Sequence, residues 1–148
     1  MPQTYTVAYA IATFAGANGT APAIAATGVT VTAVNPSNGN NVSKLGAAGI
    51  QVSGQASMAI TLSDGSSNVF TPIGLALQGV PSGGSKPGKG NSNLFPATSI
   101  DGNAITLTDN TPSKGPPPNT TTNYEFVVLF QDSNGYFLVL DPLISNIQ

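Results

Sequence analysis

Four residue types are missing from this chain, and each absence removes a class of chemistry. There is no cysteine, histidine, tryptophan or arginine among the 148 residues. Disulfide bonds, thiolate nucleophiles and zinc sites built on cysteine or histidine are therefore excluded. A Ser-His-Asp triad cannot be assembled either.

Charge is also scarce. Charged residues make up 7% of the chain, against roughly 25% in a typical soluble domain. The only cations are Lys44, Lys86, Lys89 and Lys114, which are too few and too scattered to bind nucleic acid. A net charge of -2 gives little repulsion between molecules, so we expect the protein to associate readily.

Long apolar runs are absent as well. No stretch approaches the roughly 20 apolar residues of a membrane helix, so no membrane partner is expected. The first residues, MPQTYTVAYAIATF, lack the basic region of a secretory signal. By default we expect a cytoplasmic location.

The residues that are present predict one all-β domain spanning residues 1–148. Short alternating or apolar segments are separated by turns rich in Gly, Asn, Pro and Asp, and no segment has helical periodicity. We expect strands at Thr4 to Thr13, Gly28 to Val34, Leu45 to Gly54, Ala56 to Leu62, Val69 to Leu77, Ala104 to Thr108, Phe126 to Phe130 and Tyr136 to Leu140. Seven or eight such strands favour an immunoglobulin-like antiparallel β-sandwich, with a jelly roll as the alternative.

The stretch from Asn123 to Asn146 is the most informative segment. Two apolar strands flank Asp132-Ser133-Asn134-Gly135, which is typical of a type I turn followed by a glycine bulge. Pairing Asp132 with Tyr136 places Phe130 opposite Leu138, since the turn sets the register.

This register divides the hairpin side chains between two faces. The larger, wholly apolar set is assigned to the core: Tyr124, Phe126, Val128, Phe130, Tyr136, Leu138 and Leu140. The other face carries Val127, Leu129, Phe137 and Val139, bordered by Glu125, Gln131 and Asp141. An apolar patch with a polar border normally has a cover, so these four residues form a candidate interface. A second subunit is the expected cover, and the loop residues 86–95 are the competing one.

Tyr124 is a candidate tyrosine corner. It follows a long Pro-rich crossing at the start of the strand before last, where immunoglobulin-like folds place such a tyrosine. Its hydroxyl is expected to bond to backbone around Thr120 to Thr122.

The closing residues carry a resemblance to a known family. Asp141, Pro142, Ile144 and Asn146 match an ending of the form Asp-Pro-x-Ile-x-Asn, after a strand that begins Tyr-x-Phe-x-Val at Tyr124. This segment of about 25 residues resembles the end of a group of small bacterial proteins, the DP-EP family. The resemblance implies a β-sandwich without a settled activity, and no functional residue carries over. The chain itself contains no Glu-Pro. Independently of any family, Pro142 should stop its strand or mark a bulge, because proline cannot donate a ladder hydrogen bond.

The acidic residues predict no catalytic or metal site. Asp64, Asp101 and Asp132 occupy turn positions, and turn formation explains their presence. The other acidic residues are Asp109, Glu125 and Asp141, and no sequence feature places any two of the six carboxylates together. Calcium is conceivable at three of the turns, but each has a single acid. We therefore expect no enzyme activity, no cofactor and no small-molecule ligand that the sequence can name.

Two functions from different classes remain. The first is a structural or assembly protein whose partner is another copy of itself, as the apolar patch and the low charge indicate. The second is a carbohydrate-binding module that stacks sugars on exposed Tyr5, Tyr9 or Phe95, although the tryptophan that sugar sites prefer is missing.

Replacing Tyr124 with Phe tests the corner. If the hydroxyl is hydrogen-bonded in the core, the variant should lose about 1–2 kcal/mol of unfolding free energy. Urea unfolding of the two proteins measures the difference, and unchanged stability would show that the hydroxyl lies in water.

Overall fold

The described part of the protein is entirely β-structure, as predicted. The computed structural model describes residues 3–11, 24–25, 29–36, 41–65, 67–80, 98–110, 121–140 and 143–147. Its strands are β1 (Gln3–Ala10), β2 (Ile24–Ala25), β3 (Thr30–Asn35), β4 (Val42–Leu45), β5 (Gly49–Val52), β6 (Ala56–Ser63), β7 (Phe70–Val80), β8 (Thr98–Asp101), β9 (Ala104–Asp109), β10 (Thr121–Asp132), β11 (Phe137–Leu140) and β12 (Leu143–Ile147). None of the described residues forms a helix long and apolar enough to span a membrane.

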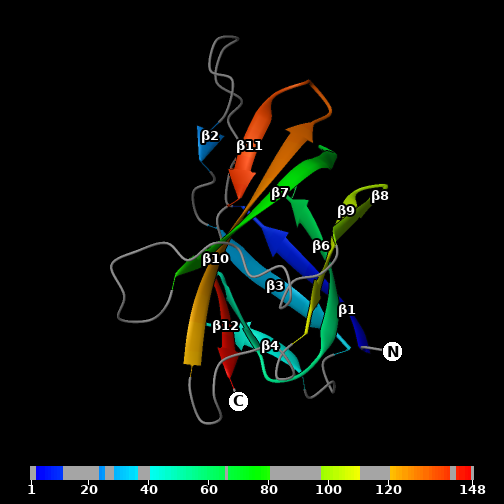
Figure 1. Cartoon of the computed structure of the whole chain (residues 1–148). Coiled ribbons are helices and arrows are strands. Elements are labelled where there is room, and N and C mark those ends of the chain that lie inside the picture. The colour runs from blue at the N-terminus through cyan, green and yellow to red at the C-terminus, as the bar shows by residue number, and fades with distance from the viewer. Residues whose placement is uncertain are drawn as a thin grey trace.

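The strands form two sheets that pack as a sandwich (Figure 1). The first has the order β3-β1-β6-β9-β8. The second has the order β2-β11-β10-β12-β5-β4, and β7 lies on the other side of β10. Most pairs are antiparallel, but β1 with β6, β2 with β11 and β5 with β12 are parallel. Two packed sheets are the feature common to the immunoglobulin-like and jelly-roll arrangements.

There are more strands than the seven or eight predicted. The additional strands are short and add to sheet edges or extend existing pairs. The predicted strand Leu45 to Gly54, for example, contains only the shorter β5, which forms a hairpin with the preceding strand β4 through a turn at Gly46, where φ is 62°. A positive φ favours glycine, which lacks a Cβ.

The predicted hairpin is confirmed in its register. Phe130 pairs with Leu138 and Val128 with Leu140 along β10 and β11. β12 then continues on the same side of β10, with Leu143 opposite Glu125. The pair Val128 with Leu140 and the pair Glu125 with Leu143 are separated by three residues on each strand. The register is therefore the same on both sides of residues 141–142, which lie outside the described residues, so the role of Pro142 stays a prediction.

One core lies between the sheets and contains most of the predicted inward residues. Its members, all at most 8% exposed, are Tyr5, Val7, Tyr9, Ile11, Val31, Val34, Val42, Ile50, Val52, Ala56, Met58, Ile60, Leu62, Phe70, Ile105, Leu107, Phe126, Val128, Phe130, Leu138, Leu140 and Ile144. Tyr136 was also predicted to be inside, and this is wrong: it is half-buried, because it lies beside the hairpin turn. The side chain of Tyr124 lies outside the described residues, so its corner role stays a prediction.

Two β-bulges change which residues point inward. In the pairing of β1 with β3, Ala8 faces Ala33 but Tyr9 faces Val31, so Thr32 is an extra residue. The hydroxyl of Thr32 donates to the carbonyl of Ala8 at 3.0 Å. Beyond the extra residue the alternation is shifted, and Val34 is buried where the sequence predicted Ala33.

The second bulge lies between β7 and β10. Leu129 pairs with Gly74 and Phe130 with Pro72, which leaves Ile73 as the extra residue. Pro72 points into the core and is buried. Ile73 is 44% exposed, because the inserted residue faces outward opposite Leu129.

Two buried tyrosines of β1 differ in their hydrogen bonds. The Tyr5 hydroxyl donates to Gln3 Oε1 at 2.7 Å and accepts from the backbone N–H of Asn41 at 3.2 Å. The Tyr9 hydroxyl is buried and has no hydrogen-bond partner among the described residues. This burial raises the pKa of Tyr9 well above its ordinary value of 10.0.

The pair gives a matched test. Tyr5→Phe should cost about 1–2 kcal/mol, because the N–H of Asn41 loses its acceptor. Tyr9→Phe should stabilise the protein by about 1 kcal/mol, since a buried hydroxyl without a partner costs free energy. Urea unfolding at neutral pH measures both, and a loss of stability in Tyr9→Phe would contradict the unpaired hydroxyl.

The difference in unfolding free energy between Tyr9→Phe and the wild type should increase at alkaline pH. The pKa of Tyr9 is higher in the folded than in the unfolded protein. Below about pH 10 the tyrosine is neutral in both states, and the free energy of unfolding does not depend on its titration. At higher pH the unfolded state loses this proton first, so the free energy of unfolding falls. Wild-type stability should therefore fall more steeply than that of Tyr9→Phe above about pH 10.

Candidate functional site

The candidate site begins at the hairpin turn, because the turn decides which side chains share a face. The N–H of Asp132 donates to the carbonyl of Tyr136 at 2.8 Å, and the N–H of Gly135 donates to the carbonyl of Asp132 at 3.0 Å. Gly135 has a φ of 86°. This is the predicted type I turn with a glycine bulge.

The carboxylate of Asp132 holds this turn together from inside. Its Oδ1 accepts from the backbone N–H groups of Asn134 at 3.0 Å and Tyr136 at 2.7 Å. Its Oδ2 accepts from Asn68 Nδ2 at 3.2 Å. Asp132 is only 6% exposed, so these donors replace water as its solvation.

Asn68 connects the turn to the segment that precedes β7. Its Oδ1 accepts from the backbone N–H and the hydroxyl of Ser133 while its Nδ2 donates to Asp132. The hairpin tip and the start of β7 are thus held side by side, which supports the pairing of Asp132 with Phe70.

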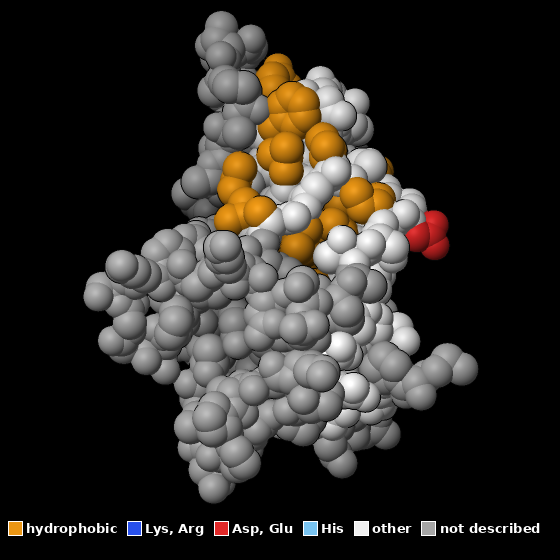
Figure 2. Space-filling model, viewed as in Figure 1, with side chains coloured by type: hydrophobic (Ala, Val, Ile, Leu, Met, Phe, Trp, Pro, Cys, Tyr) orange, Lys and Arg blue, Asp and Glu red, His pale blue; other side chains and the backbone are white. Residues whose placement is uncertain are grey.

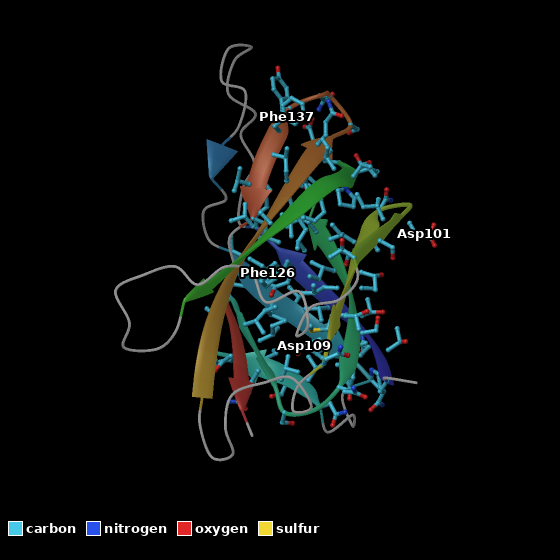
Figure 3. The ribbon with its side chains drawn as sticks, viewed as in Figure 1. Asp101, Asp109, Phe126 and Phe137 are labelled. Atoms are coloured by element: carbon cyan, nitrogen blue, oxygen red, sulfur yellow. The ribbon has the colours of Figure 1, made fainter. Side chains whose placement is uncertain are left out.

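The register places the four predicted interface residues together on the outer face of the second sheet. Val127 and Leu129 lie on β10, and Phe137 and Val139 lie on β11, where Leu129 pairs directly with Val139. All four are half-buried. Figure 3 shows Phe137 near the hairpin tip and the core residue Phe126 in the middle of the molecule.

β7 extends this surface with two residues that sequence reasoning did not assign to it. Ile73 is inserted opposite Leu129, and exposed Ala76 pairs with Val127. We call Val127, Leu129, Phe137, Val139, Ile73 and Ala76 the outer-face patch. No sequence signal shows that Ile73 belongs here, because its direction depends on the bulge; Ala76 could have been found from the alternation once its partner strand was known.

The outer-face patch carries no charge. Figure 2 shows hydrophobic side chains gathered over β7, β10 and β11 on one face of the molecule. Gln131 and Thr71, which pair with each other, border the patch at the hairpin end. The side chain of Glu125, and Asp141 as a whole, lie outside the described residues, as does the competing cover at residues 86–95.

The aromatic residues considered for sugar stacking are not available at the surface. Tyr5 is 0% and Tyr9 1% exposed, because both point into the core from β1. The expectation that they are exposed is wrong, and Phe95 lies outside the described residues. The described surface therefore shows no row of exposed aromatic rings.

The described carboxylates occupy different parts of the fold. Asp101 is exposed at the turn between β8 and β9 (Figure 3), whereas Asp109 is fully buried at the end of β9. The alternation of Ile105 and Leu107 along the strand is the sequence signal that places Asp109 on the inward face. In the described ranges, no three acidic side chains come together in a way that could hold a metal ion.

Comparison with known proteins adds no family. No protein-family model matches the chain. No curated protein matches its sequence.

Asp132 offers a test of turn formation against calcium binding. Asp132→Ala should lose about 2–3 kcal/mol of unfolding free energy, because buried N–H donors lose a charged acceptor. Asp101→Ala, in an exposed turn, is the matched control and should change stability by less than about 0.5 kcal/mol. Thermal unfolding with excess Ca²⁺ and with chelator should give the same midpoint, and a rise with Ca²⁺ that Asp132→Ala abolishes would contradict this account.

Proposed function

We propose that this protein is a non-catalytic β-sandwich protein that assembles with copies of itself. A second copy covers the outer-face patch through a two-fold contact. The observation that carries the proposal is a continuous apolar surface on three adjacent strands, β7, β10 and β11, without a charged side chain among its described residues.

The physical argument rests on the free energy of burial. Complete burial of a large apolar side chain contributes about 1.5–3 kcal/mol. Val127, Leu129, Phe137 and Val139 are half-buried, so a cover recovers part of this amount from each, and more from Ile73, which is 44% exposed. Few charges oppose the approach of a second copy, because the net charge is -2.

A two-fold contact suits this surface. In such a contact the same patch meets itself, so any charged residue at its centre would face an equal charge or be buried unpaired. The outer-face patch avoids both costs among its described residues. Its polar neighbours Gln131 and Thr71 can remain in water at the border of the contact.

Side-chain chemistry supports the non-catalytic part of the proposal. The chain has no histidine or cysteine, and the buried carboxylate of Asp132 is occupied by N–H donors. Sugar binding loses two of its three proposed stacking residues, because Tyr5 and Tyr9 are buried. The resemblance of the closing segment to the DP-EP family is compatible with a β-sandwich that has no settled activity.

We also propose the immunoglobulin-like variant of the sandwich. The support is the position of Tyr124 near the start of the long central strand β10, because the preceding strand in sequence, β9, belongs to the other sheet.

Replacing Leu129 with Lys tests the assembly. The lysine would place a charge in the middle of the contact, so the variant should run at a lower mass than the wild type at the same concentration. Size-exclusion chromatography with light scattering over a range of concentrations measures the mass. Ile73→Lys, at an exposed position of the same patch, should weaken the assembly with less risk to folding.

The matched control is Ser99→Lys, on exposed β8 of the other sheet. It adds the same charge away from the outer-face patch and should leave the mass unchanged. A wild type that stays monomeric at the highest concentration, or dissociation caused equally by Ser99→Lys, would overturn the proposal.

A further inference from the structure

The free edge of β7 differs from the other sheet edges in the described part of the chain. β7 is 11 residues long and pairs there with β10 alone. The edge strands β4 and β8 have four residues each, and each carries a charge, at Lys44 and Asp101. β2 has two residues.

The edge strand β3 is attached to the neighbouring sheet. The N–H of Val31 donates to the carbonyl of Ala47 at 2.8 Å, and Lys44 Nζ donates to the carbonyl of Thr32 at 2.6 Å. These bonds join the hairpin of β4 and β5 to β3 and close one side of the sandwich. β7 has no charged residue, and no comparable bond joins Leu75 to Val80 to another described residue.

Protection of the β7 edge is confined to its first half. The hairpin register directs the backbone groups of Phe130 toward β11, so the paired residue Pro72 turns its own backbone away from β10. Proline has no N–H there to offer a neighbouring strand, and the bulge at Ile73 twists the edge. Natural sheets use both devices to prevent edge-to-edge pairing.

The second half of β7 is a regular strand without these devices. Ala76 pairs with Val127, Gln78 with Glu125 and Val80 with Asn123, and by the alternation of the ladder their backbone groups point toward β10. The N–H and C=O groups of Leu75, Leu77 and Gly79 therefore point away from it. The edge strand β8 belongs to the other sheet, where it pairs with β9.

We propose that Leu75 to Gly79 is a second interaction site, at which β7 of another copy pairs antiparallel to form one sheet across both molecules. The occupant must be an extended backbone, because only that can satisfy a row of alternating N–H and C=O groups. A second copy fits because the segment is self-complementary. Centred on Leu77, the register pairs Leu75 with Gly79 of the partner subunit, and each pair exchanges two hydrogen bonds.

The charge of the segment favours the same occupant. No residue of β7 is charged, so two copies meet without repulsion. The contact uses the edge of the sheet and leaves its outer face open, so it is independent of the assembly through the outer-face patch. The Leu129→Lys variant, in which that assembly is broken, is the background in which to test it.

Hydrogen exchange of backbone amides provides the test, with its own internal control. In dilute Leu129→Lys protein, the amides of Leu75, Leu77 and Gly79 should exchange fast, whereas those of Ala76, Gln78 and Val80 should be protected by β10. At high concentration only the first set should slow, by about tenfold when nine-tenths of the protein is paired. Protection of the first set that is independent of concentration would show an edge already covered within one molecule and would overturn the proposal.

A substitution provides the second arm. Gly79→Pro removes an outward N–H, at a position where β7 donates nothing to β10, and should abolish the concentration dependence. Gly79→Ala keeps the N–H and should retain it. If Gly79→Pro pairs as well as Gly79→Ala, the edge contact is wrong.

The two proposed contacts can fail separately. Suppose that amide exchange in the Leu129→Lys protein depends on concentration as expected, but the Leu129→Lys and wild-type proteins have the same mass. The outer-face assembly is then wrong and the edge contact stands.

Discussion

The buried carboxylate of Asp132 is the constraint on which the rest of the second sheet depends. It accepts from backbone N–H groups on the far side of the turn and from Asn68 in the segment before β7. These bonds fix the register of β10 with β11, and they bring β7 to the other side of β10. Because side chains alternate along a strand, a slip of one residue would exchange the core face with the outer face. A single charged group thus decides whether Phe130 or Leu129 is buried.

Local sequence chemistry was sufficient to predict this part of the fold. The turn Asp132 to Gly135 and the apolar runs beside it are adjacent in sequence, so their pairing needs no knowledge of distant strands. The same reasoning located the core face and the four central residues of the outer-face patch. Tyr136 is the exception, because its parity is right but its position at the tip of the hairpin leaves it half-buried.

Non-local pairing could not be predicted in the same way. Three pairs of strands are parallel, and the partners in each are distant in sequence. The bulges at Thr32 and Ile73 depend on the partner strand, since an extra residue exists only relative to its neighbour. Alternation alone therefore predicted that Ala33 points into the core, and it could not show the direction of Ile73. Tyr5 and Tyr9 show a different error: their inward parity was visible, but they were treated as surface residues for sugar binding.

The scarcity of charge connects the two proposed contacts. Sheet proteins commonly keep their edges apart with lysine, but this chain has four lysines and none on β7. The first half of β7 is protected by Pro72 and the bulge instead, and the second half of β7 has neither. Pairing of two β7 edges requires a two-fold axis perpendicular to the sheet, whereas covering the outer-face patch requires an axis parallel to it. Two perpendicular two-fold axes that intersect generate a closed set of four copies. If the axes do not meet, the same contacts produce an open chain, so the offset between Leu77 and the centre of the patch decides between a tetramer and a fibre.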